Sequence, residues 1–83
     1  MTKDDTKLYQ EVVDITTSYL GPAAERFITR QIKNHLNKDP DELSPRDLAK
    51  LVDWIKIAIA LLTEDSKMVQ NYTDSLLKLA QRR

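Results

Sequence analysis

The segment from Ser44 to Leu62 constrains the fold of this chain more than any other. It holds the single tryptophan, Trp54, and between that residue and Leu62 the only polar side chain is Lys56. Ser44 and Pro45 form a typical helix start, because serine caps a first turn well and proline suits the first helical position. Apolar residues then recur at helical spacing in two adjacent stripes. They are Leu48, Val52, Ile55, Ile59 and Leu62 in one stripe, and Leu51, Trp54, Ala58 and Leu61 in the other. We therefore expect a central helix over residues 44–62 that is buried on most of its sides.

Three further helices are expected, over about residues 4–20, 22–36 and 66–81. Apolar residues three and four positions apart predict each of them, although residues 12–19 also alternate in a way that could suit a strand. Gly21-Pro22 punctuates the first pair, since glycine ends helices and proline opens them. Residues 63–66 contain neither glycine nor proline, so one continuous helix over residues 45–81 is the alternative. The expected fold is all-α, a compact bundle of four helices in a single domain that spans residues 1–83.

Charge and cysteine content narrow the classes of partner. The chain carries 13 basic and 13 acidic residues, so its net charge gives no bulk attraction to nucleic acid or to an anionic membrane. It has no cysteine, which excludes disulfides and thiolate sites and fits a reducing compartment. The N-terminal residues lack the apolar core of a secretory signal, and no apolar run approaches the roughly 20 residues of a membrane span. We expect a cytoplasmic protein that does not bind membranes.

The residues that catalysis or cofactor binding would need are few. His35 is the only histidine and Gly21 the only glycine, so neither a histidine pair nor a glycine-rich phosphate loop can form. Asn37, Asp39 and Asp41 match the first oxygen ligands of an EF-hand loop. The positions that need glycine and bidentate glutamate are instead occupied by Glu42 and Leu48. We therefore expect no catalytic residues, no cofactor, no metal site and no enzymatic activity.

A basic row is predicted on the outer face of the second helix. Arg26, Arg30 and Lys33 follow one another at helical spacing and could contact an acidic protein surface or phosphate groups. No aromatic residue lies between them for base stacking, so a solvated face is the simplest interpretation. A nucleic-acid-associated regulator remains the alternative function, although nucleic acid is not the expected partner.

Apolar surface in excess of what one small bundle can bury is the strongest functional signal. Ile57, Ala60 and Leu61 are difficult to place inside an 83-residue bundle, although the other three helices could enclose them. The alternative is a docking face with Trp54 or Tyr72 as an aromatic anchor. On this basis we expect a non-enzymatic protein-protein interaction or regulatory module that binds a protein partner or itself, with a homodimer favoured.

Residues 19–27 read Tyr-Leu-Gly-Pro-Ala-Ala-Glu-Arg-Phe. This segment resembles the I/L-G-P-x-A-x-x-hydrophobic motif of small helical modules that are appended to bacterial, notably cyanobacterial, signalling proteins and kinases. The resemblance covers about nine residues and implies a non-catalytic regulatory or protein-interaction role in signalling. It brings no catalytic or ligand-binding residues with it.

Overall fold

The computed structural model describes residues 2–82, and within that range it contains helices and short connections but no strand. The helices are α1 (Thr2–Leu20), α2 (Ala24–Leu36), α3 (Pro45–Ala60) and α4 (Ser66–Arg82). Two single 3-10 turns, η1 (Gly21–Ala23) and η2 (Pro40–Glu42), lie in the connections on either side of α2. The prediction of an all-α fold is confirmed. Side chains are described for residues 8–81.

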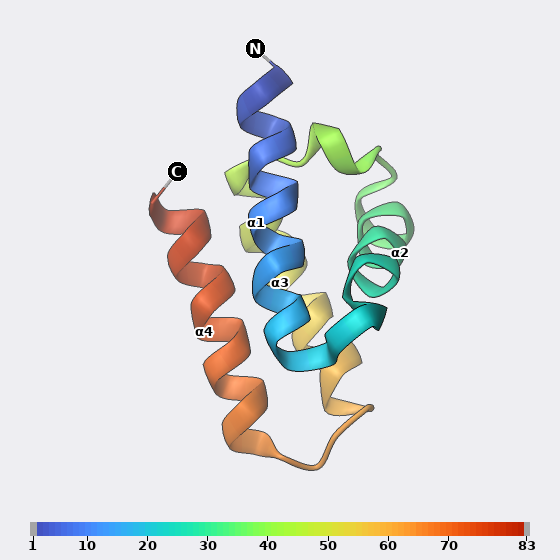
Figure 1. Ribbon diagram of the computed structural model, residues 1–83, viewed down its shortest axis with the longest axis vertical. Helices are drawn as coiled ribbons and strands as arrows, with labels where there is room; N and C mark the ends of the chain where they lie inside the picture. Colours follow the sequence, from blue (N-terminus) through green and yellow to red (C-terminus); the bar gives the residue numbers. More distant parts are fainter. Residues whose placement is uncertain (1, 83) are drawn as a thin grey trace.

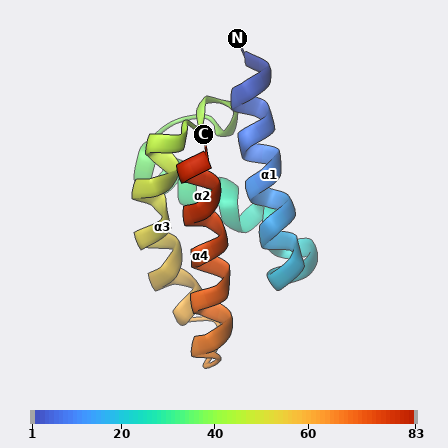
Figure 2. The same ribbon diagram turned by 90° about the vertical axis from the view of Figure 1, so that its left-hand side faces the viewer.

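The helices pack as neighbours around one shared interior. α3 packs most extensively against α4 and also contacts α2, while α1 contacts α2, η2 and α4. Figure 1 shows α4 and α2 on opposite sides of the molecule, and Figure 2 shows α1 and α3 flanking α4. Because α3 has neighbours on two sides, one of its faces points inward and the opposite face has no helix over it.

The interior is filled by the predicted inner stripes of the helices. α1 contributes Leu8 and Val12, α2 contributes Ile28 and Ile32, and the connection before α3 contributes Leu43. The remaining core residues come from α1, α3 and α4; they are Val13, Leu48, Leu51, Val52, Ile55, Ile59, Val69, Tyr72, Leu76 and Leu79. Burying an aliphatic side chain of this size stabilises a fold by about 1.5–3 kcal/mol, so this cluster is the main source of stability.

The joint between α1 and α2 depends on Gly21. Its φ of +69° lies in the left-handed region, which glycine adopts without a steric penalty. The chain then makes the η1 turn, in which the Ala24 N–H donates to the Gly21 carbonyl. α2 therefore begins at Ala24 and not at Pro22 as expected, because Pro22 belongs to the tighter turn.

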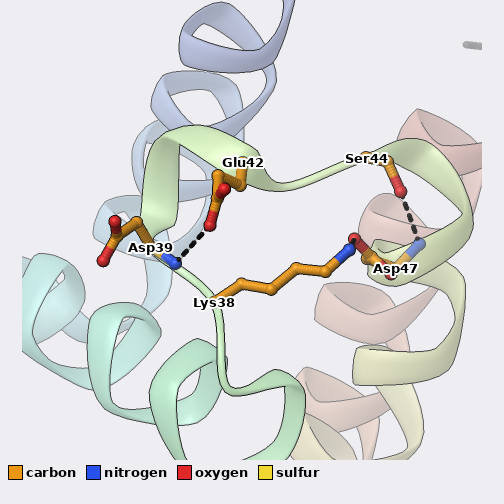
Figure 3. Close-up of polar contacts among 5 residues, drawn as sticks. All are labelled: Lys38, Asp39, Glu42, Ser44 and Asp47. Atoms are coloured by element: carbon orange, nitrogen blue, oxygen red, sulfur yellow. Dashed lines mark hydrogen bonds and ion pairs between the residues drawn. The ribbon is translucent and has the colours of Figure 1, made fainter.

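Polar side chains order the connection from α2 to α3 (Figure 3). Asn37 ends α2 with a left-handed φ of 54°, as its small polar side chain allows. The Asp39 N–H donates to the Glu42 carboxylate at 3.0 Å, and the Asp47 N–H donates to the Ser44 hydroxyl at 3.1 Å. Ser44 is thus the predicted cap of α3, with Pro45 in its first turn.

A Lys38–Asp47 ion pair closes the same connection, with 2.6 Å between Nζ and Oδ2. Partial burial opposes ionisation of Asp47, but hydrogen bonding to Lys38 and Ser44 outweighs it, so the pKa of Asp47 lies below its usual value. The hydrogen bond to Asp47 in turn raises the pKa of Lys38. The pair stays ionised at neutral pH and fixes the start of α3 relative to the end of α2.

The chain breaks between α3 and α4, so the alternative of one continuous helix over residues 45–81 is wrong. α3 ends at Ala60, two residues before its expected end, and residues 61–65 form the connection. The Asp65 side chain then accepts from the Met68 N–H at 3.0 Å and caps α4. A carboxylate at this position also suits the positive end of the helix dipole.

Candidate functional site

Exposed apolar side chains in the second half of α3 form the candidate site. Trp54 is 49% exposed, Ile57 58% and Leu61 83%. They follow one another at spacings of three and four residues, and Leu61 keeps helical backbone angles at the C-cap of α3. The three side chains therefore line one face of the helix, and we call them the α3 apolar stripe. Ala60 is also exposed and borders the stripe, as does Leu62 at 64% exposure.

The opposite face of α3 explains why the stripe is left uncovered. Leu48, Val52 and Ile55 are buried on the inner face, together with Leu51 and Ile59. With 100° between successive residues, Ile57 lies roughly opposite this inner face. Neighbouring helices can cover only the inner face and its flanks. The interpretation in which the other helices enclose Ile57, Ala60 and Leu61 is therefore wrong.

Trp54 has one intramolecular partner on its exposed side. The His35 ring, from the last turn of α2, stacks on the indole with 4.3 Å between ring centroids and an interplanar angle of 6°. Stacking of this kind fixes the orientation of an aromatic side chain before a partner arrives. About half of the Trp54 surface remains open to solvent. The indole is therefore a partly immobilised aromatic group at the α2 edge of the stripe.

Tyr72 does not lie on this surface, which corrects its assignment as an aromatic anchor. Its side chain is fully buried, and its hydroxyl lies 2.6 Å from the hydroxyl of Thr16. Its ring packs at 5.1 Å from the ring of Tyr19. Burial, opposed in part by the hydrogen bond to Thr16, raises the pKa of Tyr72 to about 12. Because α1 supplies a partner for the hydroxyl, the tyrosine can occupy the core.

The basic row lies on the exposed face of α2. Arg26, Arg30 and Lys33 are all exposed, and together with Pro22, Thr29 and Asn34 they line a shallow depression that also includes Ala23 and Glu25. Among residues 8–81 the one ion pair is Lys38–Asp47, so none of these three cations is neutralised by an acidic neighbour. Their positive charge is available to a partner.

Two features of the candidate site were missed in the sequence. Leu62 was assigned to the inner stripe of α3, but the early end of the helix leaves it exposed. His35 was placed on the margin of its helix, with no sign that it would stack on Trp54. The contact joins residues 19 positions apart and depends on how α2 and α3 pack, which residue spacing within one helix does not report.

Chemical groups of other kinds do not gather in the described part of the chain. No set of three or more His, Cys, Asp or Glu side chains there could hold a metal ion. None of the helices within residues 2–82 combines the length and the hydrophobicity of a membrane-spanning helix. No family model, no curated protein and no solved structure matches this chain.

Proposed function

We propose that this chain is a non-enzymatic helical interaction module that associates with itself through the α3 apolar stripe. The observation that carries the proposal is the exposure of Trp54, Ile57 and Leu61 on one face of α3. Large apolar side chains that are contiguous on a surface mark a contact site more often than single exposed ones do. A tryptophan held in place at the edge is the kind of residue that dominates binding energy at interfaces.

The energetics favour association over a solvated stripe. Burying one isoleucine or leucine stabilises a contact by about 1.5–3 kcal/mol, and a symmetric dimer buries each side chain twice. The net charge of zero means that two copies meet without overall electrostatic repulsion. The cost of association is several kcal/mol, so the stripe and its borders must all contribute.

The proposal includes the wider setting of the molecule. We take α1 to α4 as one bundle and residues 1–83 as one domain, so that the stripe is presented by a rigid unit. A regulatory role in signalling is supported by the Leu20-Gly21-Pro22 joint and its resemblance to appended signalling modules. A cytoplasmic location is supported by the lack of cysteine, as expected for a reducing compartment.

Light scattering after size-exclusion chromatography tests self-association directly. Over a series of concentrations, wild type should reach a mass twice that of one chain. Ile57→Asp should raise the Kd of the dimer by at least about 100-fold, because two isoleucines are lost and two charges are buried. The emission of Trp54, the only tryptophan, should shift to shorter wavelength as wild type dimerises.

Leu77→Asp is the matched control, since Leu77 is a partly exposed leucine on α4 and lies outside the stripe. Circular dichroism establishes that each variant retains its helix content. The proposal is wrong if wild type stays monomeric up to high micromolar concentration. It is equally wrong if Leu77→Asp weakens the dimer as much as Ile57→Asp does.

A second candidate function rests on the basic row. Three unpaired cations around one shallow depression could follow a phosphate backbone, as in a nucleic-acid-associated regulator. Fluorescence anisotropy with a labelled oligonucleotide, at low and at raised salt, tests this. Binding should weaken steeply with salt and be reduced in Arg30→Ala, whereas no binding at low salt would exclude the candidate.

A further inference from the structure

Two opposite charges stand at equal distances from the centre of the α3 apolar stripe. Lys50 lies seven residues before Ile57, and Glu64 lies seven residues after it. Both side chains are exposed, and neither forms an ion pair or hydrogen bond with another described residue. Lys50 lies two helical turns before Ile57 on the same face as the stripe. The stripe is therefore apolar in the middle, basic toward the start of α3 and acidic beyond its end.

Glu64 is placed by the connection that follows α3. It lines a shallow depression together with Lys56 and Ala60 of α3 and with Val69 and Gln70 of α4. Its carboxylate is thus held beside the last turn of α3, near the end of the stripe and far from Lys50. A helix rises 1.5 Å per residue, which puts Lys50 about 10 Å from Ile57 along the axis.

This arrangement distinguishes between the two ways in which a second copy can pack on the stripe. If the two α3 helices run antiparallel about a two-fold axis at Ile57, Lys50 meets Glu64 of the partner subunit, and the same contact forms twice. If the helices run parallel, lysine faces lysine and glutamate faces glutamate. Opposite charges at the rim set orientation more than they set affinity.

Side-chain size has the same symmetry. Trp54 lies three residues before Ile57 and Ala60 three residues after it. In the antiparallel arrangement each large indole therefore lies opposite Ala60 of the partner subunit, where a small residue leaves room. In the parallel arrangement the two indoles meet each other, and His35 on each indole adds further bulk.

We infer that a second copy of this chain docks on the α3 apolar stripe with the two α3 helices antiparallel, centred on Ile57 and held in register by Lys50–Glu64 pairs between the copies. This inference deepens the proposed function and rests on it. It identifies the partner as the chain itself and fixes the orientation of the interface. Self-association of any kind is the weaker requirement and is tested separately.

Charge reversal tests the orientation. Lys50→Glu and Glu64→Lys should each weaken the dimer by about 3- to 30-fold, because each replaces two weak attractions by two repulsions. The double variant Lys50→Glu/Glu64→Lys should bind within about 3-fold of wild type, since the pairs are restored with exchanged signs. Lys78→Glu on α4 makes the same charge change away from the stripe and should leave the Kd unchanged. Sedimentation equilibrium measures all five proteins.

Cysteine cross-linking gives a second readout, which is simple to interpret because the chain has no cysteine of its own. Under mild oxidation, a mixture of Lys50→Cys and Glu64→Cys chains should form the mixed disulfide dimer. Lys50→Cys alone should cross-link poorly, although Ile57→Cys alone should cross-link readily at the two-fold axis.

The outcomes separate the orientation from self-association. A dimer whose Kd ignores both single charge reversals, or in which Lys50→Cys cross-links to itself, overturns the antiparallel arrangement and leaves the proposed function standing. A wild-type chain that is monomeric at every concentration overturns the proposed function, and the arrangement with it. Loss of affinity in both single variants with recovery in the double variant supports the arrangement.

Discussion

Tyr72 shows how a single hydroxyl group lets an aromatic residue occupy a helical core. The Thr16 hydroxyl donates to the Val12 carbonyl at 2.7 Å, so its oxygen is free to accept from Tyr72 at 2.6 Å. A buried hydroxyl without a partner is costly, and Thr16 removes that cost. The pair therefore ties α1 to α4 at a point where both side chains are completely buried.

The two halves of this pair should differ in what their loss costs. Thr16→Val leaves the Tyr72 hydroxyl buried without a partner, which should lower the free energy of unfolding by about 1–3 kcal/mol. Tyr72→Phe removes the donor and leaves Thr16 bonded to Val12, so the loss should be only about 0.5–1.5 kcal/mol. Urea unfolding followed by circular dichroism measures both. A larger loss in Tyr72→Phe would contradict this account of the pair.

Tyr72 also makes the fold sensitive to alkaline pH. Its pKa in the folded state is raised to about 12 from the ordinary value of 10.0, so folding favours the neutral phenol. This stabilisation is complete below pH 10 and is lost as pH rises from 10 to 12; at most it amounts to about 2–3 kcal/mol. Wild type should lose stability more steeply than Tyr72→Phe over this range. Equal slopes in pH-dependent urea unfolding would show that Tyr72 does not titrate as described.

Among the elements, the joint between α1 and α2 depends on backbone conformation and not on packing. A Cβ on Gly21 would meet nothing within 4 Å, yet the φ of +69° disfavours any side chain. Gly21→Ala should therefore destabilise the fold by about 1–2 kcal/mol without a steric clash. Gly21→Asn should cost less, because asparagine tolerates this region, as Asn37 does at the end of α2. Thermal unfolding of both variants tests the order, and equal losses would point to another cause.

Helix positions could be predicted well, and helix ends less well. Periodicity identified α3 and α4 because their inner residues recur at every third and fourth position. It placed the end of α3 at residue 62 because Leu61 and Leu62 continue the apolar pattern past the true end at Ala60. It placed the start of α2 at Pro22 because a 3-10 turn and a first helical turn favour the same residue. Terminal turns depend on hydrogen bonds that an apolar pattern does not encode.

The candidate site could be predicted in outline for a similar reason. A surplus of apolar residues on the central helix is countable, and it correctly identified Ile57, Ala60 and Leu61 as exposed. Which aromatic residue joins them is decided by tertiary contacts. Trp54 stays outside, covered on one face by His35, whereas Tyr72 goes inside because Thr16 faces it from another helix.

At the scale of the whole molecule, the small core and the exposed stripe are connected. A chain of 83 residues buries a modest core, so its stability margin is small. Association of folded chains adds to that margin by mass action, because the unfolded chain does not present the stripe. Dimerisation through α3 would thus stabilise the fold as well as create a binding surface.

This coupling predicts that the melting temperature depends on protein concentration. For wild type, a tenfold rise in concentration within the dimeric range should raise Tm by about 3–5 °C, since each chain gains roughly half of the 1.4 kcal/mol that a tenfold change supplies. Ile57→Asp should melt at one temperature throughout the series, because a monomer has no concentration term. At the lowest concentrations the wild-type Tm should level off, since the dissociated wild type is also a monomer. Differential scanning fluorimetry over three decades of concentration measures this, and a wild-type Tm that does not change with concentration would show that folding and association are independent.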